Sequence, residues 1–170
     1  ITWLRIYNTE GNLLVESKIS MKDSGYPVSV SLSPNALMCA VSYFYTDMGV
    51  MKSSVAFYNF GEVGQNKPDN FVAGYDYSDT LVPYVQFMNE ESSFAVGDDR
   101  LLFFNGNQKP ENVNNILLSE EIQSVYYNSQ YVGLVFVSES GNGKRIDVYD
   151  VSGNKLTSQE ITMNYTDIMF

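Results

Sequence analysis

The 170-residue sequence contains no histidine and a single cysteine, Cys39. Histidine is the commonest general base and the commonest metal ligand, so catalysis here would depend on carboxylates, tyrosine or a bound ion. One cysteine cannot form an internal disulfide or a cysteine-rich zinc site. Because Cys39 lies between apolar neighbours and no histidine is present to activate it, we interpret it as a small core residue.

Basic residues and long apolar segments are also scarce. The sequence has 10 Lys and Arg against 20 Asp and Glu, which gives a formal net charge of −10. This balance argues against nucleic acid and anionic membrane surfaces as partners, because both attract clustered basic side chains. Uninterrupted apolar stretches span only a few residues, so we expect no membrane insertion by this segment and no signal peptide within it.

Apolar and aromatic residues are abundant instead, at 44% and 14% of the sequence, which is enough for a packed core. They alternate with polar residues or form short β-branched and aromatic runs, as in Val28–Ser33 and Val82–Phe87, a pattern typical of strands. Turns rich in Gly and Asn, such as 105–107 and 152–154, separate these runs, because both residues tolerate positive φ. We therefore predict an all-β fold with essentially no helix, in which Gly61–Gly64 is a surface connection.

A short motif recurs along the chain and consists of an apolar residue, an aromatic residue and then Asn or Asp. It occurs at Ile6-Tyr7-Asn8, Phe57-Tyr58-Asn59, Phe103-Phe104-Asn105 and Val148-Tyr149-Asp150. The aromatic positions are 51, 46 and 45 residues apart, which gives a period of about 47 residues. Residues 4–14 also align with residues 146–156 in their Tyr, Gly, Asn and final Leu. A period in the forties with about four short strands per unit is typical of a β-propeller blade.

We predict one β-propeller-like domain over residues 1–170, with about 3.5 to 4 four-stranded blades. The predicted blades are 1–20 (partial), 26–77, 80–120, 121–162 and 163–170 (partial). A β-sandwich is the alternative, but a sandwich gives no reason for a hairpin motif at a fixed interval. Because closed propellers have about four to eight blades, the chain either pairs an inner strand at Tyr165–Phe170 with an outer hairpin at Ile1–Ile19 or forms half of a larger ring. In the second case, two copies would form a homodimer through their open blade faces.

The segment Ser33–Ser42 is a Ser-Pro-Asn turn followed by an apolar strand, and it resembles the blades of WD-repeat and TolB-type propellers. The chain as a whole resembles an uncharacterised propeller-like family of Gram-positive bacteria, a domain of unknown function. This resemblance implies an extracytoplasmic propeller behind an N-terminal membrane anchor, so we expect a place in the bacterial cell envelope, with the cytoplasm as the alternative. The sequence has no Gly-His pair and no Trp-Asp dipeptide, so neither the WD-repeat hydrogen-bond network nor a ligand set is carried over.

Acidic residues near predicted strand ends form a candidate binding rim. It consists of Asp76, Tyr77 and Asp79 before one inner strand, and of Asp98 and Asp99 after another strand. Several carboxylates close together are typical of Ca²⁺ sites, whereas isolated Asp residues more often stabilise turns. We predict no catalytic residue and no cofactor, with Ca²⁺ at this rim as the one metal candidate.

The predicted function is non-catalytic: a binding or protein-interaction module whose loops recognise a protein or a carbohydrate. One alternative is a carbohydrate-active enzyme that uses carboxylates from different blades, because the adjacent pairs Glu90-Glu91 and Glu120-Glu121 point to opposite faces of a strand. The other is a fragment of a larger propeller without a site of its own. Six tyrosines either line a binding rim or fill the space between blades: Tyr26, Tyr43, Tyr45, Tyr75, Tyr77 and Tyr84.

Overall fold

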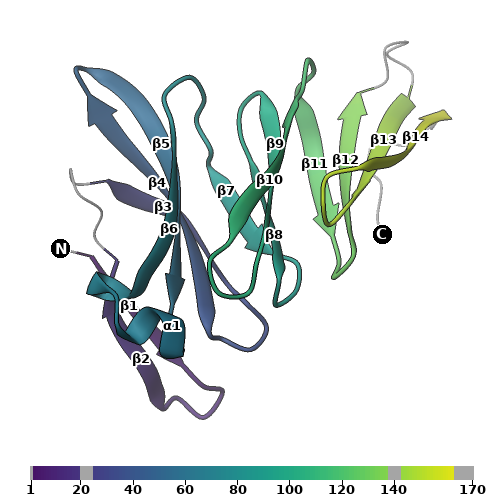
Figure 1. Cartoon of the computed structure of the whole chain (residues 1–170). Helices are drawn as coiled ribbons and strands as arrows, with labels where there is room; N and C mark the ends of the chain where they lie inside the picture. Colours follow the sequence, from purple (N-terminus) through teal and green to yellow (C-terminus); the bar gives the residue numbers. More distant parts are fainter. Residues whose placement is uncertain (1, 20–24, 138–142, 163–170) are drawn as a thin grey trace.

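The computed structural model describes residues 2–19, 25–137 and 143–162, which form four antiparallel sheets in chain order (Figure 1). The first sheet, the N-terminal hairpin, consists of β1 (Trp3–Tyr7) and β2 (Leu13–Lys18). Three four-stranded sheets follow, each with its strands side by side in sequence order. Blade 1 consists of β3 (Tyr26–Leu32), β4 (Met38–Asp47), β5 (Val50–Asn59) and β6 (Phe71–Tyr77). Blade 2 consists of β7 (Tyr84–Phe87), β8 (Ser92–Val96), β9 (Arg100–Asn105) and β10 (Glu111–Leu117), and blade 3 of β11 (Ile122–Tyr127), β12 (Tyr131–Val137), β13 (Gly143–Asp150) and β14 (Lys155–Thr162).

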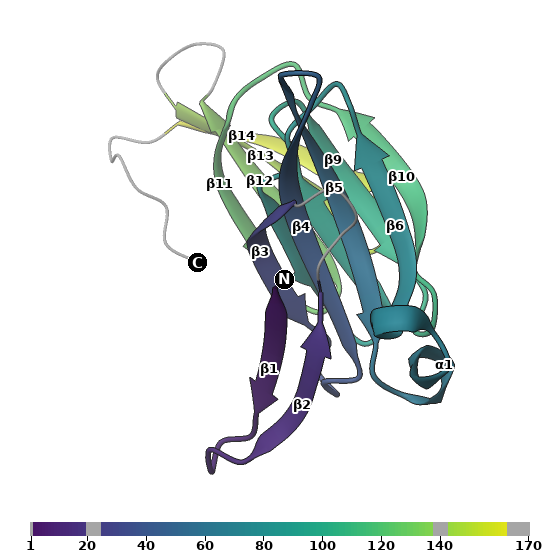
Figure 2. The same ribbon diagram turned by 90° about the vertical axis from the view of Figure 1, so that its left-hand side faces the viewer.

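The blades stand side by side and pack face to face, as both views show (Figures 1 and 2). The predicted fold class is confirmed, since the chain is all-β and its sheets form a partial propeller. The expected absence of helix is wrong between β5 and β6, where α1 (Glu62–Gln65) and the 3-10 turn η1 (Pro68–Asn70) occur. Gly64 lies so close to the carbonyl of Asn59 that a Cβ would come within 1.6 Å, so only glycine fits this turn. The inner strand predicted at 165–170 lies outside the described residues.

The first two residues of the repeated motif pack against different neighbouring sheets. Its first residue points toward the following sheet: Phe57 lies in the core between blades 1 and 2, and Phe103 in the core between blades 2 and 3. Its second residue points toward the preceding sheet: Phe104 lies in the first of these cores and Tyr149 in the second. Successive side chains of a strand point to opposite faces, so one dipeptide supplies both junctions of a blade.

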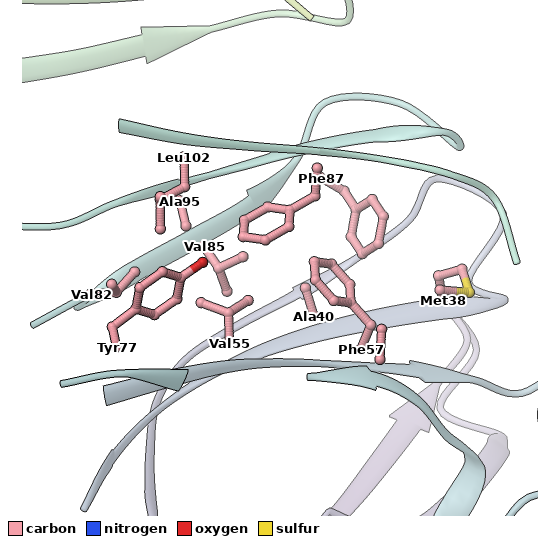
Figure 3. Packing of buried hydrophobic residues seen from close by; sticks show 12 residues of the cluster. Met38, Ala40, Val55, Phe57, Tyr77, Val82, Val85, Phe87, Ala95 and Leu102 are labelled. Carbon is pink, nitrogen blue, oxygen red and sulfur yellow. The ribbon is translucent and has the colours of Figure 1, made fainter. Parts of the chain in front are cut away.

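The core between blades 1 and 2 is an interdigitated apolar layer (Figure 3). Both sheets contribute side chains to it: Met38, Val55, Phe57, Val85, Phe87 and Leu102. Phe57 meets Phe87 and Phe104 with ring centroids 6.2 Å and 5.1 Å apart. Burying each such side chain stabilises the fold by roughly 1.5–3 kcal/mol, so this layer holds the two blades together.

Serine hydroxyls of blade 1 bind the backbone at the inner edge of blade 2. The strand β7 pairs only with β8, so its other edge presents N–H and C=O groups that need partners. Ser29 and Ser31 supply them on β7, and Ser42 and Ser53 bind the backbone of residues 80–82 just before this strand. The hydroxyl of Ser53 accepts from the N–H of Val82 at 3.0 Å and donates to the carbonyl of Thr80 at 3.1 Å, while Ser29 accepts from the N–H of Val85 at 3.2 Å.

The N-terminal hairpin is held against blade 1 by a buried hydroxyl pair. The hydroxyls of Tyr43 and Tyr58 both lie within hydrogen-bond distance of the carbonyl oxygen of Ile19 and 2.7 Å from each other, so two protons connect three oxygen atoms. Burial raises the pKa of Tyr58 to about 12, so its hydroxyl keeps its proton at neutral pH. Cys39 packs in the same core, and burial raises the pKa of its thiol to about 12, which makes it an unreactive core residue.

Candidate functional site

The structure brings two residues of the predicted acidic rim together around an arginine. The Nη2 atom of Arg100 lies 3.0 Å from Oδ2 of Asp79, and its Nε atom lies 2.8 Å from Oδ1 of Asp99. Hydrogen bonding to Arg100 lowers the pKa of Asp99 to about 2, and the hydrogen bond to Asp99 raises the pKa of Arg100. The guanidinium thus lies where a cation shared by the two carboxylates would be. Among the described residues no three carboxylate or thiol side chains are grouped to hold a metal, and calcium at this rim stays a prediction.

The other rim residues are dispersed. Asp76 and Asp98 are exposed on the surface. Tyr77 was predicted to lie at a surface rim, but it is buried between blades 1 and 2 (Figure 3). The strand β6 extends to Tyr77 and pairs it with Ser53 of β5. Of the other five tyrosines singled out in the sequence, Tyr43 is fully buried whereas Tyr26 is 76% exposed. The aromatic residues therefore serve both purposes, filling the junctions and lining the surface.

A polar pocket of about 350 Å³ lies between the outer strands of blades 2 and 3. One wall is the end of β10 with residues 118–120, and the other wall is formed by β13 and β14. The buried rings of Phe136 and Tyr149 lie at its base. The guanidinium carbon of Arg145 lies 4.6 Å from the centroid of Phe136, and Nζ of Lys155 lies 5.5 Å from that of Tyr149. These cation–π contacts hold both cations against the floor of the pocket.

The centre of the pocket is Asp147, whose side chain is only 2% exposed. Its carboxylate accepts from Nζ of Lys155 at 2.8 Å and from Oγ of Ser158 at 2.6 Å, and it pairs with Nε of Arg145 at 3.2 Å. The Nη1 atom of Arg145 also binds Oε1 of Glu120 at 2.6 Å. Two carboxylates and two cations therefore form a hydrogen-bonded chain with no net formal charge.

The environment keeps Asp147 ionised. Burial by itself raises the pKa of this carboxyl, but hydrogen bonds from Lys155 and Ser158 and the charges of Lys155 and Arg145 outweigh burial and lower the pKa overall. A buried charge is tolerated when its lone pairs are satisfied in this way. The site is therefore a preorganised set of donors and acceptors.

Sequence reasoning missed this pocket. Its only local signal is the alternation of Arg145 and Asp147 on β13, which places both side chains on one face of the strand. Glu120, the second carboxylate of this group of ion pairs, lies 25 residues from Arg145 in the sequence. Glu120 joins Arg145 and Asp147 only where the segment after β10 meets β13 in the folded chain.

The profile of a family of unknown function, DUF5711, matches residues 1–170. The chain belongs to this DUF5711 family. No curated protein sequence matches it significantly. In the described part of this DUF5711 chain, no helix has the length and hydrophobicity needed to cross a bilayer.

Two solved structures match this DUF5711 chain over most of its length. The acylaminoacyl peptidase of Pyrococcus horikoshii matches with a TM-score of 0.51 and 9% identity over 85% of this chain and 26% of the peptidase. The periplasmic gluconolactonase PpgL of Pseudomonas aeruginosa matches with a TM-score of 0.46 and 12% identity over 94% of this chain and 63% of the lactonase. The chain thus spans only part of the length of either protein. At such identity, the likeness to the peptidase is one of propeller-type fold alone.

Proposed function

We propose that this chain is a non-catalytic recognition module in which propeller blades hold a pocket for a neutral, hydroxyl-rich ligand such as an oligosaccharide. The observation that carries the proposal is the pocket between blades 2 and 3. There Glu120, Arg145, Asp147 and Lys155 form one hydrogen-bonded chain without net charge. Rigid blades that present fixed polar groups are a usual basis for ligand recognition.

The pocket lining suits a ligand that donates and accepts hydrogen bonds at neighbouring atoms. The side chains of Glu120 and Lys155 are 33% and 48% exposed, so an acceptor and a donor both remain accessible. The hydroxyls of Ser119 and Ser158 line the same space. A sugar hydroxyl is at once donor and acceptor, and it can bridge such groups without disturbing the charge balance. An anionic or cationic ligand would compete with the ion pairs already present.

The pKa shifts of the carboxyl groups favour ligand binding over glycoside hydrolysis as the function of this chain. A glycosidase general acid needs a raised pKa so that it carries a proton at neutral pH. Among the described residues, the carboxyl groups with shifted pKa values are all shifted downward: Asp99, Asp147 and Asp150. In the pocket, Arg145 pairs with both Glu120 and Asp147, and its charge is one of the causes that lower the pKa of Asp147. These groups suit ligand orientation better than proton donation.

We also propose that this domain lies on the outer side of a bacterial cell envelope. Its support is the sequence resemblance to anchored, extracytoplasmic propellers. Protease treatment of intact cells tests it, because an outward-facing domain is degraded while cytoplasmic proteins survive. Full protection in intact cells, with cleavage after lysis, would place the domain in the cytoplasm.

Saturation-transfer NMR with a panel of neutral and acidic oligosaccharides tests the proposed ligand class. Ser119 is an exposed residue that lines the pocket, whereas Ser129 is an exposed turn residue outside it. We expect transfer to neutral oligosaccharides with the wild-type chain and with Ser129→Trp, and its loss with Ser119→Trp, whose indole fills the pocket. Equal transfer in both variants, or transfer to no oligosaccharide, would contradict the proposal.

A further inference from the structure

The N-terminal end of the sheet stack exposes a face that the inner junctions bury. The second motif residue points toward the preceding sheet and is buried in all three blades, as Tyr58, Phe104 and Tyr149. Its counterpart in the N-terminal hairpin, Tyr7, is 55% exposed, and Trp3 on the same face of β1 is 48% exposed. An aromatic surface built for a junction therefore lies open at this end.

The other end of the stack exposes the complementary face. The first motif residue points toward the following sheet and is buried at Ile6, Phe57 and Phe103. In blade 3 the same position is Val148, which is only half-buried, as is Ile146 on the same face of β13. No described sheet follows blade 3, because β14 is the last strand of the described residues.

The free face of blade 3 carries a pocket of about 250 Å³ with a mostly apolar lining. Ile146, Val148 and Tyr131 contribute to its walls, and Gly133 leaves room at its base. In both inner junctions, the ring of the second motif residue lies against the first motif residue of the preceding sheet, with ring centroids 5.1 Å and 6.3 Å apart. At the free face the first motif residue is Val148, and a second motif residue docked there would occupy this pocket.

We infer that a second copy of this chain docks its N-terminal hairpin on the free face of blade 3, with Tyr7 of one copy in the pocket beside Val148 of the other. Within one molecule the hairpin and the free face of blade 3 lie at opposite ends of the stack (Figure 1), so the two described surfaces cannot meet in the same chain. A second copy brings together the two kinds of face that already pair at both inner junctions.

The contact is head-to-tail, and two such contacts close a ring of two copies around a twofold axis. The described residues of each copy contribute three four-stranded sheets and one two-stranded sheet. Two copies thus provide about eight radial units, which lies within the range of about four to eight blades in closed propellers. Ring closure also shields both apolar ends from water, which stabilises the pair.

Light scattering after size-exclusion chromatography tests the inference on the wild-type chain. One copy has a mass of 19.2 kDa, and we expect the mass of two. A mass of one copy at every concentration examined would overturn the inference, whatever any variant does.

Charge substitutions on the two faces test the mode of contact. Tyr7→Asp and Val148→Asp should each convert the pair to single copies, whereas Met48→Asp, at the 98% exposed tip between β4 and β5, should leave it intact. An equimolar mixture of the two disrupted variants should recover pairs, because Tyr7→Asp retains an intact blade 3 face and Val148→Asp an intact hairpin. Circular dichroism checks folding, and Tyr7→Asp remains decisive if Val148→Asp misfolds, since Tyr7 is a surface residue. Pairs that persist in Tyr7→Asp, or that dissociate equally in Met48→Asp, would overturn the head-to-tail contact.

Discussion

The junction between blades 1 and 2 and the junction between blades 2 and 3 share the same kind of apolar layer but differ in where their polar groups lie. In the first junction, serine hydroxyls bind the backbone of the inner strand β7 and of the residues just before it. In the second, asparagine side chains connect the loops: Nδ2 of Asn89 donates to the carbonyl of Ser129 at 2.7 Å, and Nδ2 of Asn114 to that of Gly153 at 3.2 Å. The outer part of this second junction is hollowed by the polar pocket.

This difference shows how one repeat yields both a closed contact and a ligand-sized opening. The apolar and aromatic motif residues fix the distance between sheets at both junctions. The polar residues around that layer are free to vary, because they contribute less to stability than the buried rings. Binding sites in such a stack are therefore set by the residues that border the shared apolar layer.

The largest expected loss of stability is at Gly153, in the turn between β13 and β14. Gly153 and Gly11 occupy equivalent hairpin turns with φ near 80° and 84°, but a Cβ at Gly153 would lie 2.6 Å from Cδ2 of Phe103, whereas a Cβ at Gly11 would meet nothing within 4 Å. Gly11→Ala should cost roughly 1–2 kcal/mol from backbone strain alone. Gly153→Ala should cost a further ~1–3 kcal/mol because it overpacks the second junction. Urea unfolding measures the stability lost in each variant. Equal losses in the two variants would show that the second junction accommodates the added methyl group without loss of stability.

The fold was readable from the sequence because the information that specifies each blade is local. The motif residues recur at blade spacing, and the first and last of their turns fold alike: the side chains of Asn8 and Asp150 each accept hydrogen bonds from two backbone N–H groups of their own turn. Alternation along a strand then assigns the motif side chains to the two faces. The short helix α1 escaped prediction because its four residues are too few to show a helical period.

The candidate site was not readable because its parts come from distant segments. The strand β13 and its pairing with β14 bring Arg145 and Lys155 to Asp147. Glu120 and the end of β10, however, form the opposite wall only where blade 3 packs on blade 2. The predicted acidic rim failed to anticipate Arg100, which follows Asp99 directly in the sequence and joins it to Asp79. Sequence reasoning weighed these acids as metal ligands and overlooked the neighbouring cation as their partner.

The variant Asp147→Asn tests how much the ion pairs around Asp147, in the second junction, contribute to stability. Hydrogen bonds to a charged group contribute about 1.5–3 kcal/mol, so the variant should lose roughly that much stability at neutral pH. The folded-state pKa of Asp147 lies below the unfolded value, so its contribution is present above about pH 4 and is lost as the pH falls through the folded-state pKa. Urea unfolding across this range should therefore give a flatter pH dependence for Asp147→Asn than for wild type. The control is Asp76→Asn at an exposed position of β6, and identical pH profiles for the two variants would contradict the role given to Asp147.

The smallest effect concerns the serines of the first junction. Ser53 and Ser93 are both buried, but Ser53 bonds two backbone groups of residues 80–82, whereas the hydroxyl of Ser93 has no hydrogen-bond partner among the described residues. Ser53→Ala should cost about 1 kcal/mol, because it leaves the N–H of Val82 unpaired. Ser93→Ala should be neutral or slightly stabilising, because it removes a buried hydroxyl that gains nothing from burial. Thermal unfolding of the two variants measures the difference. If Ser53→Ala is no more costly than Ser93→Ala, the Ser53 hydroxyl does not hold residues 80–82 against blade 1, and the apolar layer carries that part of the first junction.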